Sequence, residues 1–526
     1  MIWVLSDNFM FFLPIIPLAL DRELRTDQNT SPQAVFRCVI RLPARLFLPI
    51  IFIVSVMKEK TSMSGFLWAT KEEREHDPTK VGLVQLAFPI LLESLLRSTV
   101  NMIDVVFMSR ISDRVVSAIS VASQYIMLSM IVSSAVATGT MVCINQAIGM
   151  HNQKKVDRLA SIAVVANLVL GLFFGALFYF FSDTFLVIMK LEPSSIANAS
   201  RYMKICGGLM FISSVEIILN SICRSMGHTR APLAINLVIN VINLIGDYLV
   251  VFHPEIIPVD PVVGVAYATV FGRLGGLLLS IWIVSRTGVR ISPKQLRPFP
   301  MEELKLSLSL GIPGGLNNLA YTLSQLVTTS IISLTGDVMV ATKVYATNLI
   351  NYIALVGMAF AQASTIMVGY RIGAGNYKEA NQIRSLVTRI ALISNAFFSL
   401  LLISVRMPLM RFFTSDPVIL NIASTIFYID FAVEIGRALN NTLAGSLQAA
   451  GDVTFQLIVN QGSGWLVSVG GSYLFAIVFG WGLYGVWIAF ALDELTRGLI
   501  LLYRWRSQKW IEAAQKRRTI LAHENV

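Results

Sequence analysis

The sequence predicts an all-α polytopic membrane protein with twelve transmembrane helices in two pseudo-symmetric lobes of six helices each. Composition gives the first reason. Of the 526 residues, 55% are hydrophobic and only 14% are charged, and the mean hydropathy is +0.67. Soluble domains carry about 25% charged residues. Apolar runs of roughly 20 residues, the length that crosses a bilayer, recur from Val81 almost to the carboxyl end.

An internal repeat gives the second reason. The motif QAIGMHNQKK in the first half corresponds to YRIGAGNYKE in the second, and RSMGHT corresponds to QAAGDV. The matching residues lie 224 positions apart: Pro89 and Pro313, Gly149 and Gly373, Asn152 and Asn376, and Gly227 and Gly451. Six spans in each half give both halves the same orientation in the membrane. This build is typical of secondary transporters, which bind cargo between their repeats.

Lysine and arginine concentrate in alternate loops and in the carboxyl-terminal tail. The stretch 285–305 carries five of them, whereas the loops HPEIIPVDP and VFGWG carry none. Because short basic loops stay in the cytoplasm, both ends of the twelve-helix body are predicted to be cytoplasmic. The expected location is the plasma (inner) membrane. Topology thus accounts for the net charge of +11, and no nucleic-acid partner is expected.

The pattern divides the chain into five segments. These are an amino-terminal extension (1–80), an amino-terminal six-helix lobe (81–285), a cytoplasmic linker (286–303), a carboxy-terminal six-helix lobe (304–505) and a basic cytoplasmic tail (506–526). The apolar run 2–20 is interrupted by Asp7 and two prolines, and the run 46–57 is too short to span. We expect translation to begin at Met57 or Met63. The alternative is a peripheral, membrane-associated extension.

Motifs for metal or covalent chemistry are absent from the sequence. The four cysteines form no CxxC pair, and the five histidines show no HxxxH spacing. No DDxxD-like run, which prenyl-transfer chemistry would need, occurs either. We therefore expect a protein that is not an enzyme and that holds no metal or cofactor beyond a coupling ion.

Ionisable residues within the spans are the candidate functional residues, because a charge at the centre of a span costs about 2.5–3.5 kcal/mol on insertion scales. In the first span, Glu93, Arg97 and Asp104 share one helix face. The fifth span carries a polar stripe at helical spacing: Asn236, Asn240, Asn243 and Asp247. The asparagines could simply join helices. Asp104 and Asp247 are the residues that we expect to carry protons.

The second lobe contains two acid–arginine pairs three residues apart. Glu494 and Arg497 lie near a helix end and are interpreted as a structural ion pair. Glu434 and Arg437 lie deeper in a span, and for them a structural and a functional role remain equally open.

From about residue 80 to 505, the chain resembles the multidrug and toxic compound extrusion (MATE) transporters. The resemblance rests on the order and spacing of several motifs: FPILLESLLRSTVNMID, NVINLIGDY, LGIPGGLNNL, GYRIGAGNYKEA and SLQAAGDVTF. It implies two six-helix lobes in a V. It also implies a monomer that exports organic cations or other amphipathic small molecules by alternating access. Inward movement of H⁺ or Na⁺ would drive this antiport, with membrane lipids as the only other partner.

The resemblance also implies a set of residues that bind the coupling cation in the first lobe. These residues are Asp104, Asn243, Asp247, Thr269, Tyr202 and Asn220. Two departures from the family pattern matter. Arg97 replaces a common glutamine, and its fixed charge would favour the ionised form of Asp104. Asn317 stands where some relatives carry a glutamate. A second-lobe cation site would then use Glu434 beside Arg437, so coupling is expected in the first lobe, with Arg97, Glu434, Arg437 and Asn317 as substrate-binding or modulating residues.

The alternative function is a flippase for lipid-linked oligosaccharides, from the related exporters that share the two-lobed build. Such a protein needs a wide cationic cavity for the diphosphate. The ionisable residues within the spans of this chain are of mixed sign rather than clustered lysines and arginines, which favours efflux.

Overall fold

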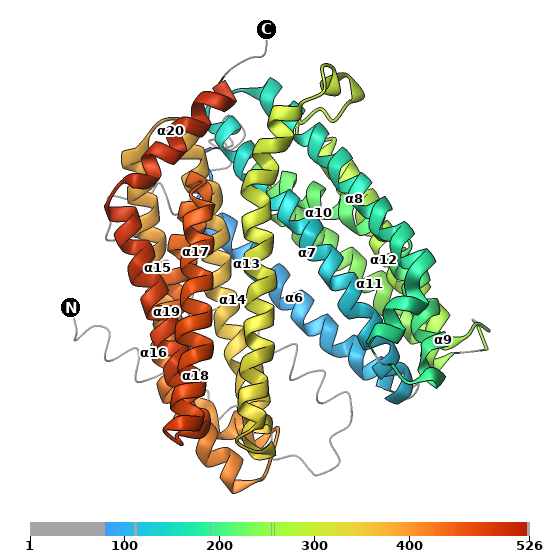
Figure 1. Ribbon diagram of the computed structural model, residues 1–526. Coiled ribbons are helices and arrows are strands. Elements are labelled where there is room, and N and C mark those ends of the chain that lie inside the picture. The colour runs from blue at the N-terminus through green and yellow to red at the C-terminus, as the bar shows by residue number, and fades with distance from the viewer. Residues whose placement is uncertain (1–78, 110–112, 190, 254, 257, 523–526) are drawn as a thin grey trace, which may run out of the picture.

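The computed structural model describes residues 79–522 apart from residues 110–112, 190, 254 and 257 (Figure 1). The side chains of residues 99–118 and of residue 194 lie outside the description as well. The extension up to residue 78, with both candidate start methionines, and the side chain of Asp104 therefore fall outside the described part of the chain.

The first half of the described chain forms a bundle that we call the first lobe. Its helices are α6 (Leu83–Ser109), α7 (Asp113–Gly149), α8 (Gln153–Ile188), α9 (Pro193–Tyr202) continued by η1 (Met203–Gly207) and α10 (Met210–Ser225), α11 (Arg230–Phe252) and α12 (Pro261–Val284). The chain from α9 to α10 is one span bent by 45°.

The second half repeats this arrangement in a second lobe. A short turn η2 (Pro293–Leu296) precedes α13 (Met301–Ser333), α14 (Asp337–Gly373), α15 (Tyr377–Arg411), α16 (Pro417–Ala450), the interrupted helix α17 (Val453–Ser463), η3 (Gly464–Gly470), α18 (Gly471–Tyr473) and η4 (Leu474–Val478), and α19 (Gly482–Arg506). Each interrupted run, α9 to α10 and α17 to η4, counts as one helical span. The described residues then contain the predicted twelve spans, six in each lobe, and no strand. Seven helices, or eight with the bent pair, are long and apolar enough to span by themselves.

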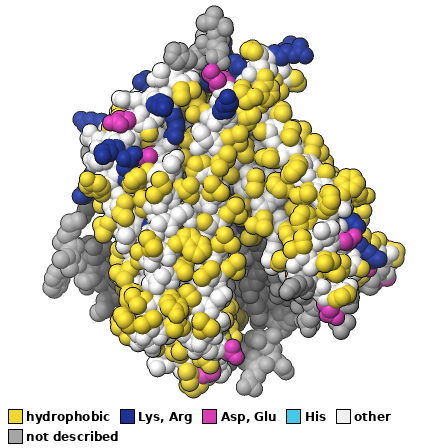
Figure 2. Space-filling model, in the orientation of Figure 1, with side chains coloured by type: hydrophobic (Ala, Val, Ile, Leu, Met, Phe, Trp, Pro, Cys, Tyr) yellow, Lys and Arg dark blue, Asp and Glu magenta, His cyan; other side chains and the backbone are white. Residues whose placement is uncertain are grey.

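The two lobes meet at one end and diverge at the other, in a V (Figure 1). The apex lies at the end where α20 (Lys509–Ala522) and the linker are found. Lysine and arginine side chains gather at this end, while hydrophobic side chains cover most of the visible flanks (Figure 2). We call it the basic end. The basic tail forms the helix α20, in which Trp510 is buried and stacks on Trp505, with ring centroids 4.2 Å apart.

The matched motifs of the repeat form matched turns at the basic end. Asn152 and Asn376 each begin a helix, accepting a hydrogen bond from the backbone N–H three residues later, at 3.0 and 3.2 Å. Gly227 and Gly451 have φ of 77° and 80°, which favours glycine. The repeat in the sequence is thus a repeat of helix starts and stops.

Candidate functional site

Asp247 lies inside the first lobe on α11 and is only 1% exposed. Asn243, one turn earlier, is also buried and donates to the hydroxyl of Thr269 on α12 at 3.4 Å. The helical spacing of Asn243 and Asp247 places them on one face. Three of the predicted cation-coupling residues are therefore close together between α11 and α12.

Tyr202 approaches the same region from α9, where the span bends. It is buried, and one turn later the thiol of Cys206 donates to the carbonyl of Ala266 on α12 at 3.4 Å. Arg273, one turn beyond Thr269 on α12, donates to Ser213 at 3.0 Å. Tyr202 thus lies on a span that contacts α12, and Cys206 is a contact to α12 that sequence reasoning missed.

Asn220, the remaining described residue of the predicted cation-coupling set, bonds within its own helix. Its amide donates to Glu216, one turn earlier on α10, at 2.6 Å, and both residues are buried. Asn220 and Glu216 therefore form a buried polar contact within α10, and the role of Asn220 in coupling stays a prediction.

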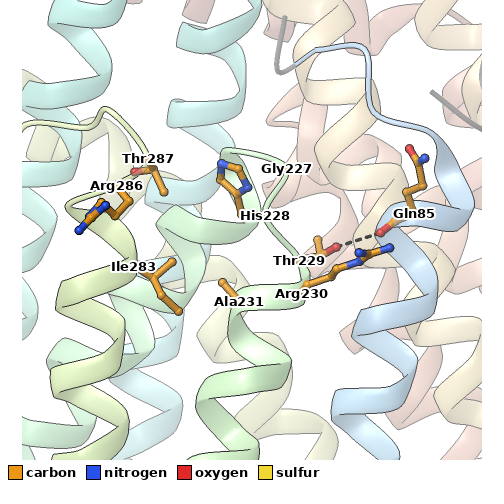
Figure 3. A pocket seen from close by; sticks show the side chains of 9 residues that line it. All are labelled: Gln85, Gly227, His228, Thr229, Arg230, Ala231, Ile283, Arg286 and Thr287. Carbon is orange, nitrogen blue, oxygen red and sulfur yellow. Dashed lines mark hydrogen bonds between the residues drawn. The ribbon is translucent and has the colours of Figure 1, made fainter. Parts of the chain in front are cut away.

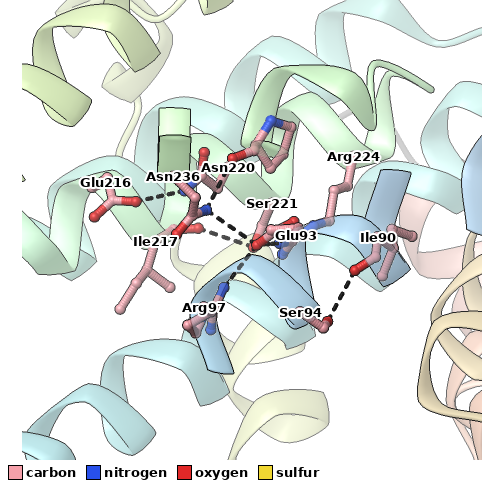
Figure 4. A network of polar contacts seen from close by, with 11 residues as sticks. Ile90, Glu93, Ser94, Arg97, Glu216, Ile217, Asn220, Ser221, Arg224 and Asn236 are labelled. Carbon is pink, nitrogen blue, oxygen red and sulfur yellow. Dashed lines mark hydrogen bonds and ion pairs between the residues drawn. The ribbon is translucent and has the colours of Figure 1, made fainter. Parts of the chain in front are cut away.

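Glu93 organises a second contact network in the first lobe (Figure 4). It is 2% exposed and receives hydrogen bonds from Arg97 at 2.7 Å, from Arg224 at 2.7 and 2.8 Å, and from Asn236 at 3.2 Å. These bonds join α6, α10 and α11. The described partner of Arg97 is thus Glu93, four residues away, while its relation to the Asp104 side chain stays a prediction.

Glu434 lies on α16 of the second lobe and is completely buried. It forms an ion pair with Arg437 and accepts a hydrogen bond from Asn395 of α15 at 3.0 Å. Asp430, one turn earlier, accepts from the indole of Trp487 on α19 at 3.1 Å. These partners come from helices far apart in sequence, so spacing alone could not reveal them.

The predicted ion pair between Glu494 and Arg497 is confirmed, at 3.3 Å. It is part of a larger contact set, because Arg497 also pairs with Asp493 and Glu494 lies 3.6 Å from Arg437. Asn440 donates to Glu494 at 2.8 Å. The two pairs that looked separate in the sequence thus form one network between α16 and α19.

The two lobes differ in their balance of charge. Among the described residues, the first-lobe polar core has three carboxylates and two guanidinium groups: Glu93, Glu216 and Asp247 with Arg224 and Arg273. A third guanidinium group, that of Arg97, pairs with Glu93 but is 58% exposed. The second-lobe polar core has four carboxylates and two guanidinium groups: Asp430, Glu434, Asp493 and Glu494 with Arg437 and Arg497. The repeat relates Arg273 to Arg497, and Asn317, which accepts from Gln461 at 3.1 Å, corresponds to Glu93.

The lobes are joined at the basic end by matched glycines, and we call this junction the seam. A Cβ atom on Gly149 of α7 would overlap the backbone carbonyl of Tyr370 on α14, and one on Gly373 would overlap that of Gln146. Residues 146 and 370 are themselves related by the 224-residue repeat. Glycine is therefore needed at both positions for the backbones to approach this closely.

Two hydrogen bonds cross the seam in the same symmetric way. The amide of Gln146 donates to the carbonyl of Ala449 at 2.7 Å, and the hydroxyl of Tyr370 donates to the carbonyl of Ser225. Ser225 and Ala449 are again 224 residues apart. Each lobe thus donates one hydrogen bond to the same position in the other lobe.

Other contacts at the basic end are not symmetric. Glu303 of α13, 2% exposed, pairs with Lys155 and Arg158 of α8 at 2.9 and 3.3 Å. On α20, Arg517 and Arg518 donate to the last carbonyls of α16 and α14, Ala450 and Gly373, at 3.5 and 3.2 Å. The same helix contacts α7 of the first lobe. The seam is therefore closed by charge as well as by close packing.

Replacing Glu303 with glutamine should weaken the seam. The change leaves the buried Lys155 and the half-buried Arg158 without their carboxylate, and removing one partner of a buried pair costs about 3–5 kcal/mol. We expect a lower melting temperature and a longer distance between labels on the exposed residues Lys154 and Lys378. Glu302→Gln, on the exposed neighbouring position, is the control. Equal behaviour of both variants would contradict a role for the ion pair.

Two like-oriented helical lobes, joined at one end and carrying ionisable groups inside, define a membrane transporter of the two-lobed class. A family model agrees with this class. The model, described as MatE, matches residues 89–249 and again 313–474, once in each lobe, and the chain belongs to the MatE family.

Relatives and solved structures agree with this assignment. The chain is 32% identical to the uncharacterized transporter YisQ of Bacillus subtilis over 82% of this chain and 95% of that protein. It is 25% identical to the probable multidrug resistance protein NorM of Thermotoga maritima, over 84% and 95%. A MATE crystal structure in the bent conformation superposes with a TM-score of 0.77 at 20% identity, covering 86% of this chain and all of that one. A transporter from Pyrococcus furiosus, described as having a binding pocket of reverse polarity, gives 0.75 at 19%, over 86% and 99%.

Proposed function

We propose that this transporter exports organic cations or other amphipathic small molecules in exchange for H⁺ or Na⁺. Family membership and the likeness to a probable multidrug resistance protein support efflux. The basic end is placed in the cytoplasm by the positive-inside rule. The V is then closed toward the cytoplasm and open toward the outside, which corresponds to the state that releases cargo.

The observation that carries coupling is the second-lobe polar core, where buried carboxylates outnumber guanidinium groups by two to one. Uncompensated negative charge in a low-dielectric interior is costly. Binding of a proton or a metal cation offsets that cost. We place one coupling site at Asp247, as the sequence suggested, and a second at Glu434 and its neighbours. Loading and unloading these sites would bias the lobes between their two arrangements.

Transport in proteoliposomes with one gradient imposed at a time tests this function. A pH gradient alone, a Na⁺ gradient alone and no gradient are compared for uptake of a fluorescent cationic dye. Uptake driven by either gradient supports antiport, and the effective gradient identifies the ion. Uptake that is indifferent to both gradients would contradict coupling.

The pairing of the arginines that the structure describes inside the lobes disfavours the flippase alternative. The guanidinium groups of Arg97 and Arg224 pair with Glu93, and those of Arg437 and Arg497 pair with acids of the second-lobe polar core. These side chains therefore do not present the cluster of free cations that a diphosphate would need. Translocation of a lipid-linked oligosaccharide by the same proteoliposomes, without dye uptake, would reverse this choice.

Glu434→Gln distinguishes a coupling role from a structural ion pair. Glutamine keeps the shape and the contact with Asn395 but removes one of the surplus negative charges. If Glu434 carries a coupling cation, gradient-driven uptake falls about tenfold and thermal stability is unchanged or higher, because repulsion among the acids is relieved. If it only balances Arg437, stability falls and coupling remains. Glu512→Gln, an exposed acid of α20, is the control.

A further inference from the structure

A cavity of about 290 Å³ opens at the basic end of the first lobe (Figure 3). It is lined by residues of three elements that meet there: Gln85 of α6, the turn Gly227–Ala231 that leads into α11, and Ile283, Arg286 and Thr287 at the end of α12. The depth of the cavity relative to the membrane follows from the ends of two membrane-spanning helices, since α11 begins at Arg230 and α12 ends at Val284. The cavity therefore lies at the level where the hydrocarbon gives way to headgroups.

The lining of this cavity favours an anion. Arg230 and Arg286 contribute two fixed positive charges and His228 a further nitrogen donor, and none of the nine lining residues is acidic. Thr229, before the first turn of α11, does not cap it, because its hydroxyl donates to the carbonyl of Gln85 at 3.0 Å. The first backbone N–H groups of α11 are thus left without a side-chain cap, next to the two arginines.

The surface that leads to the cavity is apolar. On α12, Leu278 is 60% and Trp282 57% exposed, one turn apart, and Arg286 follows one turn later. The guanidinium of Arg286 lies 5.4 Å from the centroid of the Trp282 ring. Exposed tryptophan is typical of the membrane interface. A molecule that places an anion beside Arg286 can therefore lay a hydrocarbon chain along Trp282 and Leu278.

We propose that this cavity binds the phosphate headgroup of an anionic phospholipid, with an acyl chain along the exposed face of α12. The side chains of Arg230 and Arg286 lie on opposite sides of the turn before α11 (Figure 3), so we place the phosphate at the uncapped start of α11, between these two positive charges. Basic pockets between helix ends on the cytoplasmic side are suited to anionic headgroups. The site is separate from both polar cores, so it goes beyond the proposed antiport function and does not depend on it.

Lipid binding to the purified protein tests the proposal. Native mass spectrometry compares short-chain phosphatidylglycerol with phosphatidylcholine, and inorganic phosphate is added as a competitor. Wild-type protein should retain phosphatidylglycerol selectively. The double variant R230Q/R286Q should lose roughly 25-fold in apparent affinity, about fivefold for each arginine. The single variant R286Q should lose only about fivefold in apparent affinity. Because Arg286 is exposed, this variant also shows whether the double change acts through misfolding.

The matched control is R290Q/K294Q, which removes the same charge from exposed linker positions outside the cavity. Its binding of phosphatidylglycerol should stay within about twofold of wild type. An equal loss in this control would show that only the general surface potential attracts the lipid. Equal retention of phosphatidylcholine, or full displacement by inorganic phosphate at matched concentration, would also overturn the proposal.

Discussion

Asp247→Asn should abolish cation-coupled transport while the protein still folds. The carboxyl group is buried beside Asn243 and Thr269, and asparagine has nearly the same shape but cannot exchange a proton or neutralise a cation. Gradient-driven dye uptake is expected to fall to about a tenth of wild type or less. Replacing a buried charged group with a neutral isostere is often neutral for stability, so the melting temperature should stay close to that of the wild type.

The control for this variant is Asp183→Asn, because the side chain of Asp183 is 65% exposed in the same lobe. It should transport like the wild type. Full dye uptake by well-folded Asp247→Asn protein would remove Asp247 from the coupling mechanism. Coupling would then have to rest on the second-lobe polar core alone.

Gly373→Ala and Gly149→Ala should each open the seam. A single added methyl group meets the backbone of the opposite lobe, which cannot move aside as a side chain could. Overpacking of this kind costs about 1–3 kcal/mol, and the cost applies only to the arrangement in which the lobes touch. The ratio of closed to open molecules at the basic end is therefore expected to fall roughly 5- to 150-fold, and export should fall with it.

Spin labels on cysteines at positions 154 and 378 measure this change as a distance distribution. Both positions are exposed at the basic end, and they are related by the repeat. Gly462→Ala is the control, because a Cβ atom there meets nothing within 4 Å. A distance distribution identical to the wild type in both seam variants would contradict the role of the glycines in closing the V.

Much of the fold was predictable because it follows from local features of the sequence. Apolar length gives the spans, and the 224-residue offset gives two like-oriented lobes. The two glycines of the seam, Gly149 and Gly373, were already among the residues that this offset matches. The repeat could not predict that each glycine contacts the opposite lobe. A sequence repeat shows which residues of the two lobes are equivalent, but it does not show how close the two lobes lie.

The candidate site was predictable only in part. Asn243, Asp247 and Thr269 follow from helical spacing and the family pattern, and the structure brings them together. The bonds from Asn395 to Glu434 and from Trp487 to Asp430 depend on how helices pack across a bundle, which one sequence does not reveal. The packing of α20 could not be predicted either, because Trp510 is buried through its stacking with Trp505, a contact that depends on how the tail folds back.

The reciprocal bonds of the seam describe an interface of the kind found in twofold homodimers. Gln146 of the first repeat bonds to Ala449 of the second, and Tyr370 of the second repeat bonds to Ser225 of the first. Once the 224-residue offset is subtracted, both bonds join position 146 to position 225. In an isologous interface each surface meets its own copy in this manner. A single six-helix chain with such a surface could pair with itself about an axis normal to the membrane. The architecture thus fits an ancestor that was half as long and worked as a dimer, before duplication let α20 and the charges inside each half diverge.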